Sequence, residues 1–238
     1  MKRICLAVLL LAALLSTSCL IRVNEKAINE KAAAGVSANG ILLTRTYPVG
    51  SPVRTYRVVG STDFTFVQKD TEPYLEVTAS ENIMPYFKYD LNDDGLLVCY
   101  FSSDSIASFR LGYVNLVLYA PDLEKLEIVG SGDANIAELC CEGDFSASIS
   151  GSGDLRIDRL SCDDLSLRIA GSGDMSIGVD SRGLIEAAIA GSGDIRLSGS
   201  ADRAAFSVAG SGDIDATGLK VANDVLTSTK GSGDIRVR

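Results

Sequence analysis

The sequence of 238 residues contains no histidine and no tryptophan. Without histidine the chain cannot build a Ser-His-Asp or Cys-His catalytic system, a zinc site with histidine ligands, or a histidine-based pH switch. These absences exclude several large classes of hydrolases and metalloproteins. We therefore predict that the protein is not an enzyme and has no catalytic residues, no metal site and no cofactor.

Basic residues are also in short supply. Lysine and arginine together number 22, against 31 aspartates and glutamates, which leaves a formal charge of −9. Proteins that bind nucleic acid need a clustered basic surface for their phosphate contacts. We therefore expect no nucleic acid partner.

Long apolar runs are scarce, and the one that stands out lies at the start of the chain. Two basic residues precede the apolar stretch 4–15, and three small residues then lead directly to Cys19. The stretch is too short for a good transmembrane helix and is typical of a signal peptide, which we assign to residues 1–18. Small residues followed by cysteine resemble the lipobox of bacterial lipoproteins. We thus expect a membrane-anchoring lipid on Cys19 and a tether over residues 19–40, the alternative being ordinary cleavage beside an incidental cysteine.

Proline and aromatic residues are missing from most of the second half. All eight tyrosines and all five prolines lie at or before Pro121, whereas 17 of the 23 glycines follow it. The segment before this boundary, 41–121, contains successive β-branched and aromatic stretches such as 56–59 and 113–118, with a turn at 92–95. These features predict a strand-rich N-terminal half.

The second half is built from a repeat. The tetrapeptide Gly-Ser-Gly-Asp begins at positions 130, 151, 171, 191, 210 and 231, so that successive copies are 21, 20, 20, 19 and 21 residues apart. A constant period of this length indicates a solenoid, in which each repeat is one coil that cannot bury its apolar face alone. We assign residues 122–238 to this solenoid.

Each coil is predicted to contain two strands. Apolar residues stand one and three places after each aspartate, as at Ile195 and Leu197, and a second alternating stretch precedes each tetrapeptide, as in 165–169. Alternation with period two is typical of strands with one buried face. We therefore predict an all-β fold, a parallel β-solenoid that the strand-rich half either continues or caps. Differences in coil length are expected at the corner opposite the tetrapeptide.

One aspartate recurs at the same corner of every coil. The column consists of Asp133, Asp154, Asp174, Asp194, Asp213 and Asp234. The ordinary interpretation is that each carboxylate accepts hydrogen bonds from turn amides. The alternatives are a weak cation site, with calcium as the candidate, or ligand recognition along the corner. Calcium prefers six to eight oxygen ligands, and one aspartate per strand spacing of about 4.8 Å supplies too few, so we favour the structural interpretation.

Three arginines, Arg156, Arg196 and Arg236, stand two places after their aspartates and are predicted to point outward. We expect them to pair with neighbouring acids on a solvated face. The alternative is a strip that binds acidic polysaccharide, as in a lyase. An enzyme built on a β-helix also needs an irregular cleft, and the regular repeat gives no sign of one.

Two cysteines indicate a further contact between coils. Cys141 and Cys162 each lie eight residues after their aspartate, so we expect them to stack one coil apart. The spacing of neighbouring coils falls within the Cα range of a disulfide, and an exported protein meets oxidising conditions. A disulfide between them is one outcome, and a column of free cysteines is the other.

The last residues, 235–238, determine whether the end of the solenoid can pair with a second copy of the chain. The final coil of a solenoid exposes a strand edge, which charged residues such as Arg236 and Arg238 can blunt. The alternative is end-to-end pairing of two copies of the chain.

Several motifs together resemble a known family, the auto-transporter adhesins with a head GIN domain, common in Bacteroidetes. The resemblance runs from about residue 41 to 238 and includes the stretch 81–83, the Asp94-Gly95 turn, the entry 119–123 and the repeated tetrapeptide followed by isoleucine. A single tetrapeptide would mean little, but the combination is specific. The resemblance implies a right-handed β-helix and a place in the cell envelope, and it brings no catalytic residues.

These observations favour a cell-envelope lipoprotein that presents a solenoid face to a protein or a glycan. A structural or signalling lipoprotein, with the solenoid as a docking platform, is the alternative, and a polysaccharide lyase or hydrolase is a third hypothesis. Residues 20–22 lack the acidic cluster that resembles a surface-export signal in Bacteroidetes lipoproteins. We therefore expect an outer-membrane lipoprotein that faces the periplasm, with the cell surface as the alternative.

Overall fold

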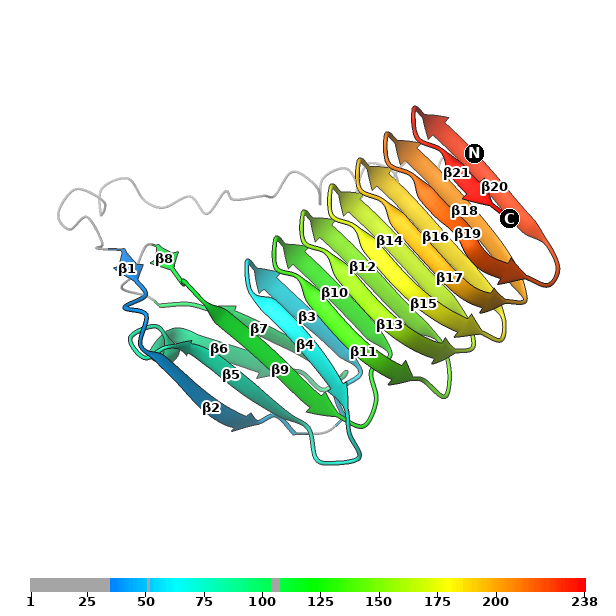
Figure 1. The fold of residues 1–238 in the computed structure, drawn as a ribbon. Helices are drawn as coiled ribbons and strands as arrows, with labels where there is room; N and C mark the ends of the chain where they lie inside the picture. Colours follow the sequence, from blue (N-terminus) through cyan, green and yellow to red (C-terminus); the bar gives the residue numbers. More distant parts are fainter. Residues whose placement is uncertain (1–34, 51, 104–107) are drawn as a thin grey trace, which may run out of the picture. The chain divides into compact units, whose positions relative to one another are not determined.

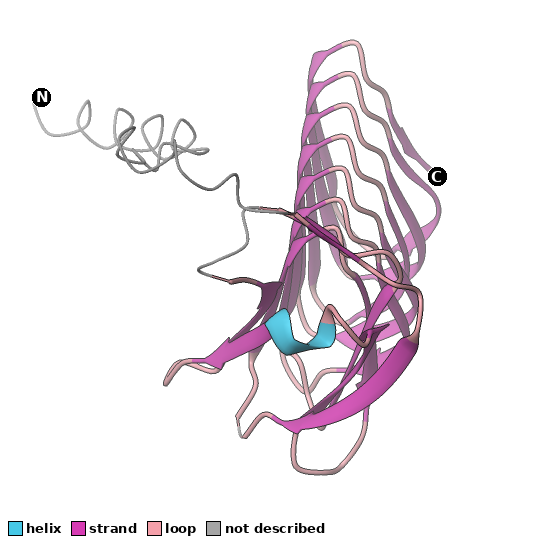
Figure 2. Cartoon of the chain, turned by 90° about the vertical axis from the view of Figure 1, so that its left-hand side faces the viewer, coloured by secondary structure: helices cyan, strands magenta, loops and turns pink. Residues whose placement is uncertain are grey.

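The computed structural model describes residues 35–50, 52–103 and 108–238, and Gly35–Arg238 forms one compact unit. The signal peptide, Cys19 and most of the tether lie outside the described residues, so lipidation stays a prediction. Within the described part, no helix has the length and apolar character needed to cross a bilayer. Its one helix is a short 3-10 turn at Met84–Tyr86, and the rest of its regular structure is β (Figure 2).

Two large sheets make up the fold (Figure 1). The nine-stranded sheet contains β3 (Thr55–Gly60), β6 (Phe87–Leu91), β7 (Leu96–Phe101), β10 (Lys125–Gly130), β12 (Phe145–Gly151), β14 (Leu165–Gly171), β16 (Leu184–Gly191), β18 (Arg203–Gly210) and β20 (Val225–Gly231). The ten-stranded sheet contains β2 (Leu42–Pro48), β4 (Asp63–Gln68), β5 (Tyr74–Ser80), β9 (Val114–Ala120), β11 (Ala134–Cys140), β13 (Leu155–Cys162), β15 (Met175–Ser181), β17 (Ile195–Ala201), β19 (Ile214–Val221) and β21 (Ile235–Val237). A small third sheet pairs β1 (Val36–Ser37) with β8 (Phe109–Arg110).

Each tetrapeptide marks one coil of a parallel solenoid. Every coil from β10–β11 to β20–β21 contributes one strand to each sheet, and neighbouring coils are joined by parallel pairing. The registers align the tetrapeptides, since Gly130 pairs with Gly151 and Gly151 with Gly171. Figure 2 shows the coils lying one behind another. The predicted parallel β-solenoid is confirmed.

The core lies between the two sheets and runs through all the coils. In β14, Leu165, Leu167 and Ile169 are buried, whereas the intervening Ser166 and Arg168 point outward. The same alternation recurs in the neighbouring strands, as the sequence pattern predicts. Burying one aliphatic side chain contributes about 1.5–3 kcal/mol, and stacking repeats this contribution in every coil.

The corner sequence requires glycine at two positions. The first glycine of each motif has a positive φ, which is 151° at both Gly171 and Gly191. A Cβ on either glycine of a motif would overlap a backbone carbonyl oxygen of the preceding coil. Residues without a side chain therefore let the backbones approach at strand spacing. The serine amide between the glycines donates to the preceding coil, as from Ser172 to the carbonyl of Gly151 at 2.9 Å.

The N-terminal half both continues and caps the solenoid. β3 and β4 form an additional coil against β10 and β11, with Gly60 in register with Gly130. The corner of this coil, residues 60–63, reads Gly-Ser-Thr-Asp, a degenerate copy of the motif that a search for the exact repeat overlooks. Thr62 replaces the second glycine there. The next coil outward, β7 and β9, follows later in the sequence, and the β8 strand between them pairs with β1.

Antiparallel strands close the N-terminal end of the stack. β5 pairs with β9, β2 with β5 and β6 with β7, all antiparallel. Aromatic rings pack beneath them, with Tyr47 and Phe87 at 5.3 Å between ring centroids. Gln68 of β4 links the coil β3–β4 to neighbouring segments through side-chain hydrogen bonds. Its side-chain amide donates to the carbonyls of Pro121 and Cys140, and its carbonyl accepts from the Cys140 amide at 2.8 Å.

Coil length varies inside the ten-stranded sheet as well as at the opposite corner. The register of β13 against β15 shifts between Ile157 and Leu160, and that of β17 against β19 shifts between Arg196 and Ser198. Each shift is a β-bulge, in which two residues of one strand oppose one residue of its neighbour. The expectation that the opposite corner absorbs the differences was therefore wrong in part, because alternation alone does not show where a strand takes an extra residue.

The glycine corner can be tested with a single methyl group. In Gly193→Ala the new Cβ would overlap the carbonyl oxygen of Gly173, and we expect the free energy of unfolding to fall by about 3 kcal/mol, because the stacked backbones cannot move apart locally. Gly143→Ala is the matched control, since a Cβ at Gly143 has no atom within 4 Å. Urea unfolding followed by circular dichroism measures both variants. Equal stability of the two would contradict close stacking at the corner.

Candidate binding surface

The aspartates of the motif form a ladder along one corner of the solenoid. From Asp133 to Asp213, the Oδ1 atom of each aspartate accepts a hydrogen bond from the backbone amide of the aspartate one coil later, at 2.8–2.9 Å. The ladder begins at Asp63 of the degenerate motif, whose Oδ1 accepts from the Asp133 amide at 3.2 Å. The hydrogen bonds therefore run between coils and not within one turn.

This bonding uses one oxygen of each carboxylate for the fold. Hydrogen bonds between an amide and an ionised carboxylate are stronger than those between neutral groups, so the ladder helps to hold the coils in register. No group of three or more acidic or cysteine side chains converges as metal ligands anywhere in the described part of the chain. A weak cation site or ligand recognition along the aspartate ladder stays an alternative to the structural interpretation.

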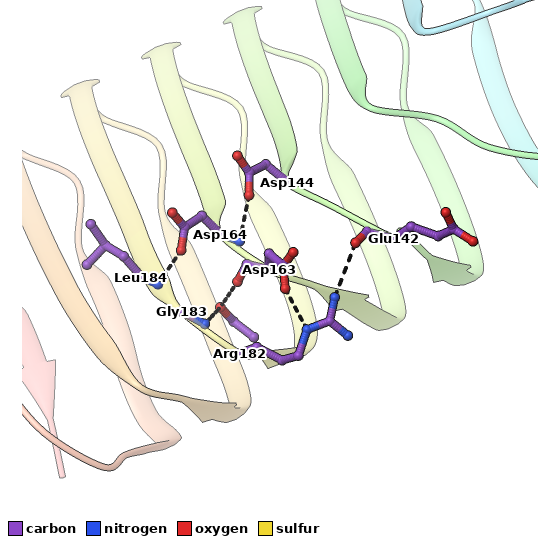
Figure 3. Close-up of polar contacts among 8 residues, drawn as sticks. Glu142, Asp144, Asp163, Asp164, Arg182, Gly183 and Leu184 are labelled. Carbon is purple, nitrogen blue, oxygen red and sulfur yellow. Dashed lines mark hydrogen bonds and ion pairs between the residues drawn. The ribbon is translucent and has the colours of Figure 1, made fainter.

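The corner opposite the ladder carries a shorter set of similar contacts (Figure 3). Asp144 Oδ1 accepts from the amide of Asp164, and Asp164 Oδ1 accepts from the amide of Leu184, at 3.1 and 2.7 Å. Arg182 pairs with Asp163 of the preceding coil at 2.5 Å. Many polar groups of both corners are thus engaged within the fold, which leaves the two sheet faces as the main surfaces for a ligand.

A groove crosses the outer face of the ten-stranded sheet over β15. It consists of three adjoining depressions of about 290, 210 and 330 Å³ that share lining residues. It extends from the aspartate ladder along the strand direction. Ser176 and Gly178 form its floor, and longer side chains of β13 and β17, among them Arg156, Asp158 and Arg196, form its walls. We call this surface the β15 groove.

The bulge in β13 explains the low floor of the β15 groove. Asp158 and Arg159 together stand opposite the single residue Gly178. A Cβ at Gly178 would overlap the carbonyl oxygen of Asp158, so the position requires glycine. Sequence reasoning missed this groove, although Gly178 interrupts the row of outward polar residues and was the available signal. Bulges often redirect side chains beside functional sites.

The three predicted outward arginines have different surroundings. Arg156 pairs with Asp158 at 2.7 Å, and Arg236 pairs with Asp213 at 3.2 Å, as expected for a solvated face. Arg196 lines the β15 groove and forms no ion pair with any residue that the structure describes. Its guanidinium is therefore available to a ligand.

Acidic groups outnumber basic ones along the groove. Its first depression is lined by four aspartates of the ladder and by two arginines. Farther along, Asp215 accepts hydrogen bonds from the hydroxyl of Thr217 at 2.6 Å and from its amide at 3.1 Å. These two hydrogen bonds lower the pKa of the Asp215 carboxyl. The groove thus carries a net negative charge.

An aromatic pair lies on the same outer face, nearer the cap. Tyr74 of β5 and Tyr119 of β9 are cross-strand partners whose rings stack with 4.5 Å between centroids and 14° between planes. The Nζ atom of Lys69 lies 5.8 and 5.7 Å from the two ring centroids. Both rings are partly exposed, so this face offers an aromatic contact in addition to its polar groups.

Comparison with known proteins assigns this architecture to a family. The model of the family described as "Putative auto-transporter adhesin, head GIN domain" matches residues 55–238. The chain belongs to this family. The resemblance drawn from the motifs is thereby confirmed, and the match covers the whole stack of coils from β3 onward.

Solved structures share the fold of this GIN-domain protein. A putative lipid binding protein from Parabacteroides distasonis is 24% identical and superposes with a TM-score of 0.75 over 86% of this chain and 100% of its own. A putative adhesin from Parabacteroides merdae is 23% identical, with a TM-score of 0.78 over 85% of this chain and 83% of its own. Identities this low establish the common fold and no more. No curated protein matches the chain significantly.

The described part of the GIN-domain protein contains four cysteines, and all are free thiols. Cys140 is in register with Ser161, which sets Cys141 beside Cys162 in the next coil, as their spacing predicts. Burial raises the pKa of both the Cys141 and the Cys162 thiol to about 12. Thiols with such pKa values stay protonated and unreactive at neutral pH. A disulfide between the two stays the alternative to a column of free cysteines.

Thiol labelling tests the cysteine column. In the native GIN-domain protein, iodoacetamide should modify the exposed Cys140 and spare the buried Cys99, Cys141 and Cys162, as read by peptide mass spectrometry. All four should react after unfolding without reductant. Resistance of Cys141 and Cys162 that only a reductant removes would show the disulfide instead, and modification of either residue in the native state would contradict their burial.

The aspartate ladder is tested by a matched pair of substitutions. Asp174→Ala removes the acceptor of the Asp194 amide, and we expect a loss of about 1 kcal/mol in the free energy of unfolding. Asp174→Asn keeps an acceptor oxygen while losing the charge, so its loss should be smaller. Hydrogen exchange should show reduced protection of the Asp194 amide in the alanine variant. Unchanged protection there would argue against the ladder as a stabilising contact.

Proposed function

We propose that this GIN-domain protein is a lipid-anchored, non-enzymatic binding protein of the cell envelope that holds an extended neutral glycan in the β15 groove. The observation that carries the proposal is the groove itself, which is continuous, open and lined by residues of five neighbouring strands. The signal sequence with Cys19 and the membership of an adhesin family support the envelope location.

The β15 groove offers the groups that recognise sugar hydroxyls. The guanidinium groups of Arg156 and Arg196 donate hydrogen bonds, the ladder carboxylates accept them, and the hydroxyls of Ser176 and Ser198 do both. A sugar presents hydroxyls that both donate and accept. Because these side chains project from paired strands, little backbone ordering is needed on binding, which favours affinity.

The charge of the groove favours a neutral glycan. Four aspartates and two arginines line its first depression, so a polyanion would meet a surface of its own sign. This argues against the acidic polysaccharide that the arginine row alone suggested. Protein partners usually insert aromatic or arginine anchors into desolvated pockets. The shallow floor of Ser176 and Gly178 suits a flexible polyhydroxylated chain better.

The other hypotheses lead to different outcomes. A structural or signalling platform would bind no glycan selectively, and a lyase or hydrolase would shorten one. A general acid for glycoside cleavage needs a raised pKa, whereas hydrogen bonds from Thr217 lower that of Asp215. Asp215 is therefore poorly suited to act as the general acid of a glycosidase.

Binding of the full chain to an array of neutral and acidic polysaccharides tests the proposal. The double substitution Arg156→Ala and Arg196→Ala should weaken binding of a neutral glycan about tenfold or more, since each hydrogen bond from a charged group contributes about 1.5–3 kcal/mol and 1.4 kcal/mol corresponds to a factor of ten. Ser176→Tyr fills the floor of the groove and should abolish binding. Arg45→Ala is the control, because Arg45 is an exposed arginine of β2 in the cap.

The possible results of this experiment distinguish the three hypotheses. Unchanged binding in the Ser176→Tyr variant would remove the groove from the proposal, and selection of acidic over neutral polymers would contradict the charge argument. Failure of the unaltered chain to bind any polysaccharide would favour the platform hypothesis. Shortened polysaccharide after incubation would favour the enzyme.

A further inference from the structure

A depression of about 420 Å³ lies on the outer face of the nine-stranded sheet, the sheet that does not carry the β15 groove. Residues of four adjacent strands, β14, β16, β18 and β20, line it. Its volume falls within the range of about 300–1,000 Å³ that is usual for small-molecule sites. We call this surface the β16 depression.

Small residues explain why the surface is hollow in the middle of the β16 depression. Neighbouring outward positions of β16 and β18 carry Ala188, Ala205 and Ser207. Alanine is depleted in β-strands, so the stability of an exposed strand alone would favour a β-branched residue at two of these positions. The short side chains leave room above the sheet instead.

Two residues of opposite charge line one side of the β16 depression. Arg168 of β14 is in register with Ala188, and Glu186 of β16 is in register with Ser166. The two charged residues are therefore offset by two residues, about 6.6 Å, along the strands and by one strand spacing, about 4.8 Å, across them. Both side chains are exposed, and neither forms an ion pair with any residue in the described part of the chain.

Other charged residues on the same face are paired with one another. Arg57 of β3 stands in the same row as Arg168, three coils away. Arg57 pairs with Glu127 at 2.5 Å, and Lys125 pairs with the same glutamate at 2.7 Å. The Arg168 guanidinium has no such partner among the described residues, so its charge is available to a ligand.

An exposed leucine lies on the other side of the β16 depression. Leu226 of β20 is 69% exposed, the highest fraction among the large apolar side chains of the described residues. The register places it beside Ala205 and in the row of Glu186, two strand spacings or about 9.6 Å from that glutamate. An apolar group of a ligand that lies over Ala205 therefore contacts Leu226 and removes part of it from water.

We propose that the β16 depression binds a zwitterionic dipeptide whose first residue is apolar. Glu186 accepts hydrogen bonds from the terminal ammonium group, and Arg168 donates hydrogen bonds to the terminal carboxylate. An extended dipeptide is about 7 Å long, which matches the offset of the two charged residues along the strands. The first side chain then lies over Ala205 and contacts Leu226. This site is separate from the β15 groove and does not depend on the proposed glycan.

A membrane surface suits this face less well, although some lipid head groups are also zwitterionic. The adjoining depression, of about 520 Å³, is lined by Glu124, Asp144 and Asp164 as well as Glu186, against the single basic residue Lys125. Anionic membrane surfaces attract clusters of lysine and arginine, and the charge here has the opposite sign. A neutral zwitterion is small enough to contact the β16 depression alone.

Calorimetric titration of the full chain in mild detergent with leucyl-alanine tests the site. Converting the terminal carboxylate to an amide, or acetylating the terminal amine, should each weaken binding about tenfold, which corresponds to about 1.4 kcal/mol. Arg168→Ala should weaken binding of leucyl-alanine by a similar factor and should no longer distinguish it from its amide. Glu186→Gln should no longer distinguish it from its acetylated form, because each variant lacks the group that the blocked terminus would contact.

Leu226→Ser tests the apolar contact in the same titration. It should weaken binding of leucyl-alanine and leave binding of glycyl-alanine unchanged, because glycine has no side chain to reach position 226. Arg57→Ala is the matched control, since Arg57 stands in the row of Arg168 but is paired with Glu127, and it should not change binding. Circular dichroism shows whether each variant is folded.

Several results would overturn the proposal. One is the absence of leucyl-alanine binding to the unaltered chain, and another is equal binding of the free and the blocked dipeptides. A folded Arg168→Ala variant that still distinguishes leucyl-alanine from its amide would also contradict it. Binding to phosphatidylethanolamine vesicles that requires Arg168 and Glu186, without binding of leucyl-alanine, would assign the β16 depression to a membrane instead.

Discussion

The close approach of one glycine corner to the next is the constraint on which the rest of the structure depends. At each corner two residues without side chains let a backbone carbonyl of the preceding coil occupy the space where a Cβ would stand. Because one corner joins a strand of each sheet, its position determines the register of both sheets at once. A slip of one residue would turn the buried rows of isoleucine and leucine toward solvent. The aspartate ladder reinforces this register from outside the core.

A perfect repeat produces uniform faces, and the features that can select a ligand arise where the repeat is broken. The bulge of β13 forces glycine at position 178 and thereby lowers the floor of the β15 groove. On the other sheet the repeat is kept, and the outward positions of β14 and β16 carry small residues except for Arg168 and Glu186. One solenoid thus presents two outer faces that differ in side-chain size and charge.

The N-terminal half adapts the same stacking to a different order of segments. Strands β3 and β4 enter the stack before β7 and β9 in the sequence, yet they lie between them and β10–β11 in space. Gln68 supplies side-chain hydrogen bonds to the backbone where this crossing leaves β11 without a continuous neighbour. The antiparallel strands β2, β5 and β6 then cover the end, which protects the solenoid from edge pairing there.

The sequence by itself determined the coils of the second half, the two strands of each coil and the buried apolar positions. Glycine spacing and period-two alternation are local properties, and both recur in every repeat. The sequence also determined the family, through motifs that the stacking requires. Only the tertiary structure decided that residues 60–63 form a further corner. Thr62 stands where the other motifs have their second glycine, and Asp133, which contacts Asp63 in the neighbouring coil, lies 70 residues away in the sequence. The tertiary structure also decided where the bulges fall and which arginine lacks a partner, because those depend on the register between strands, which no single strand encodes.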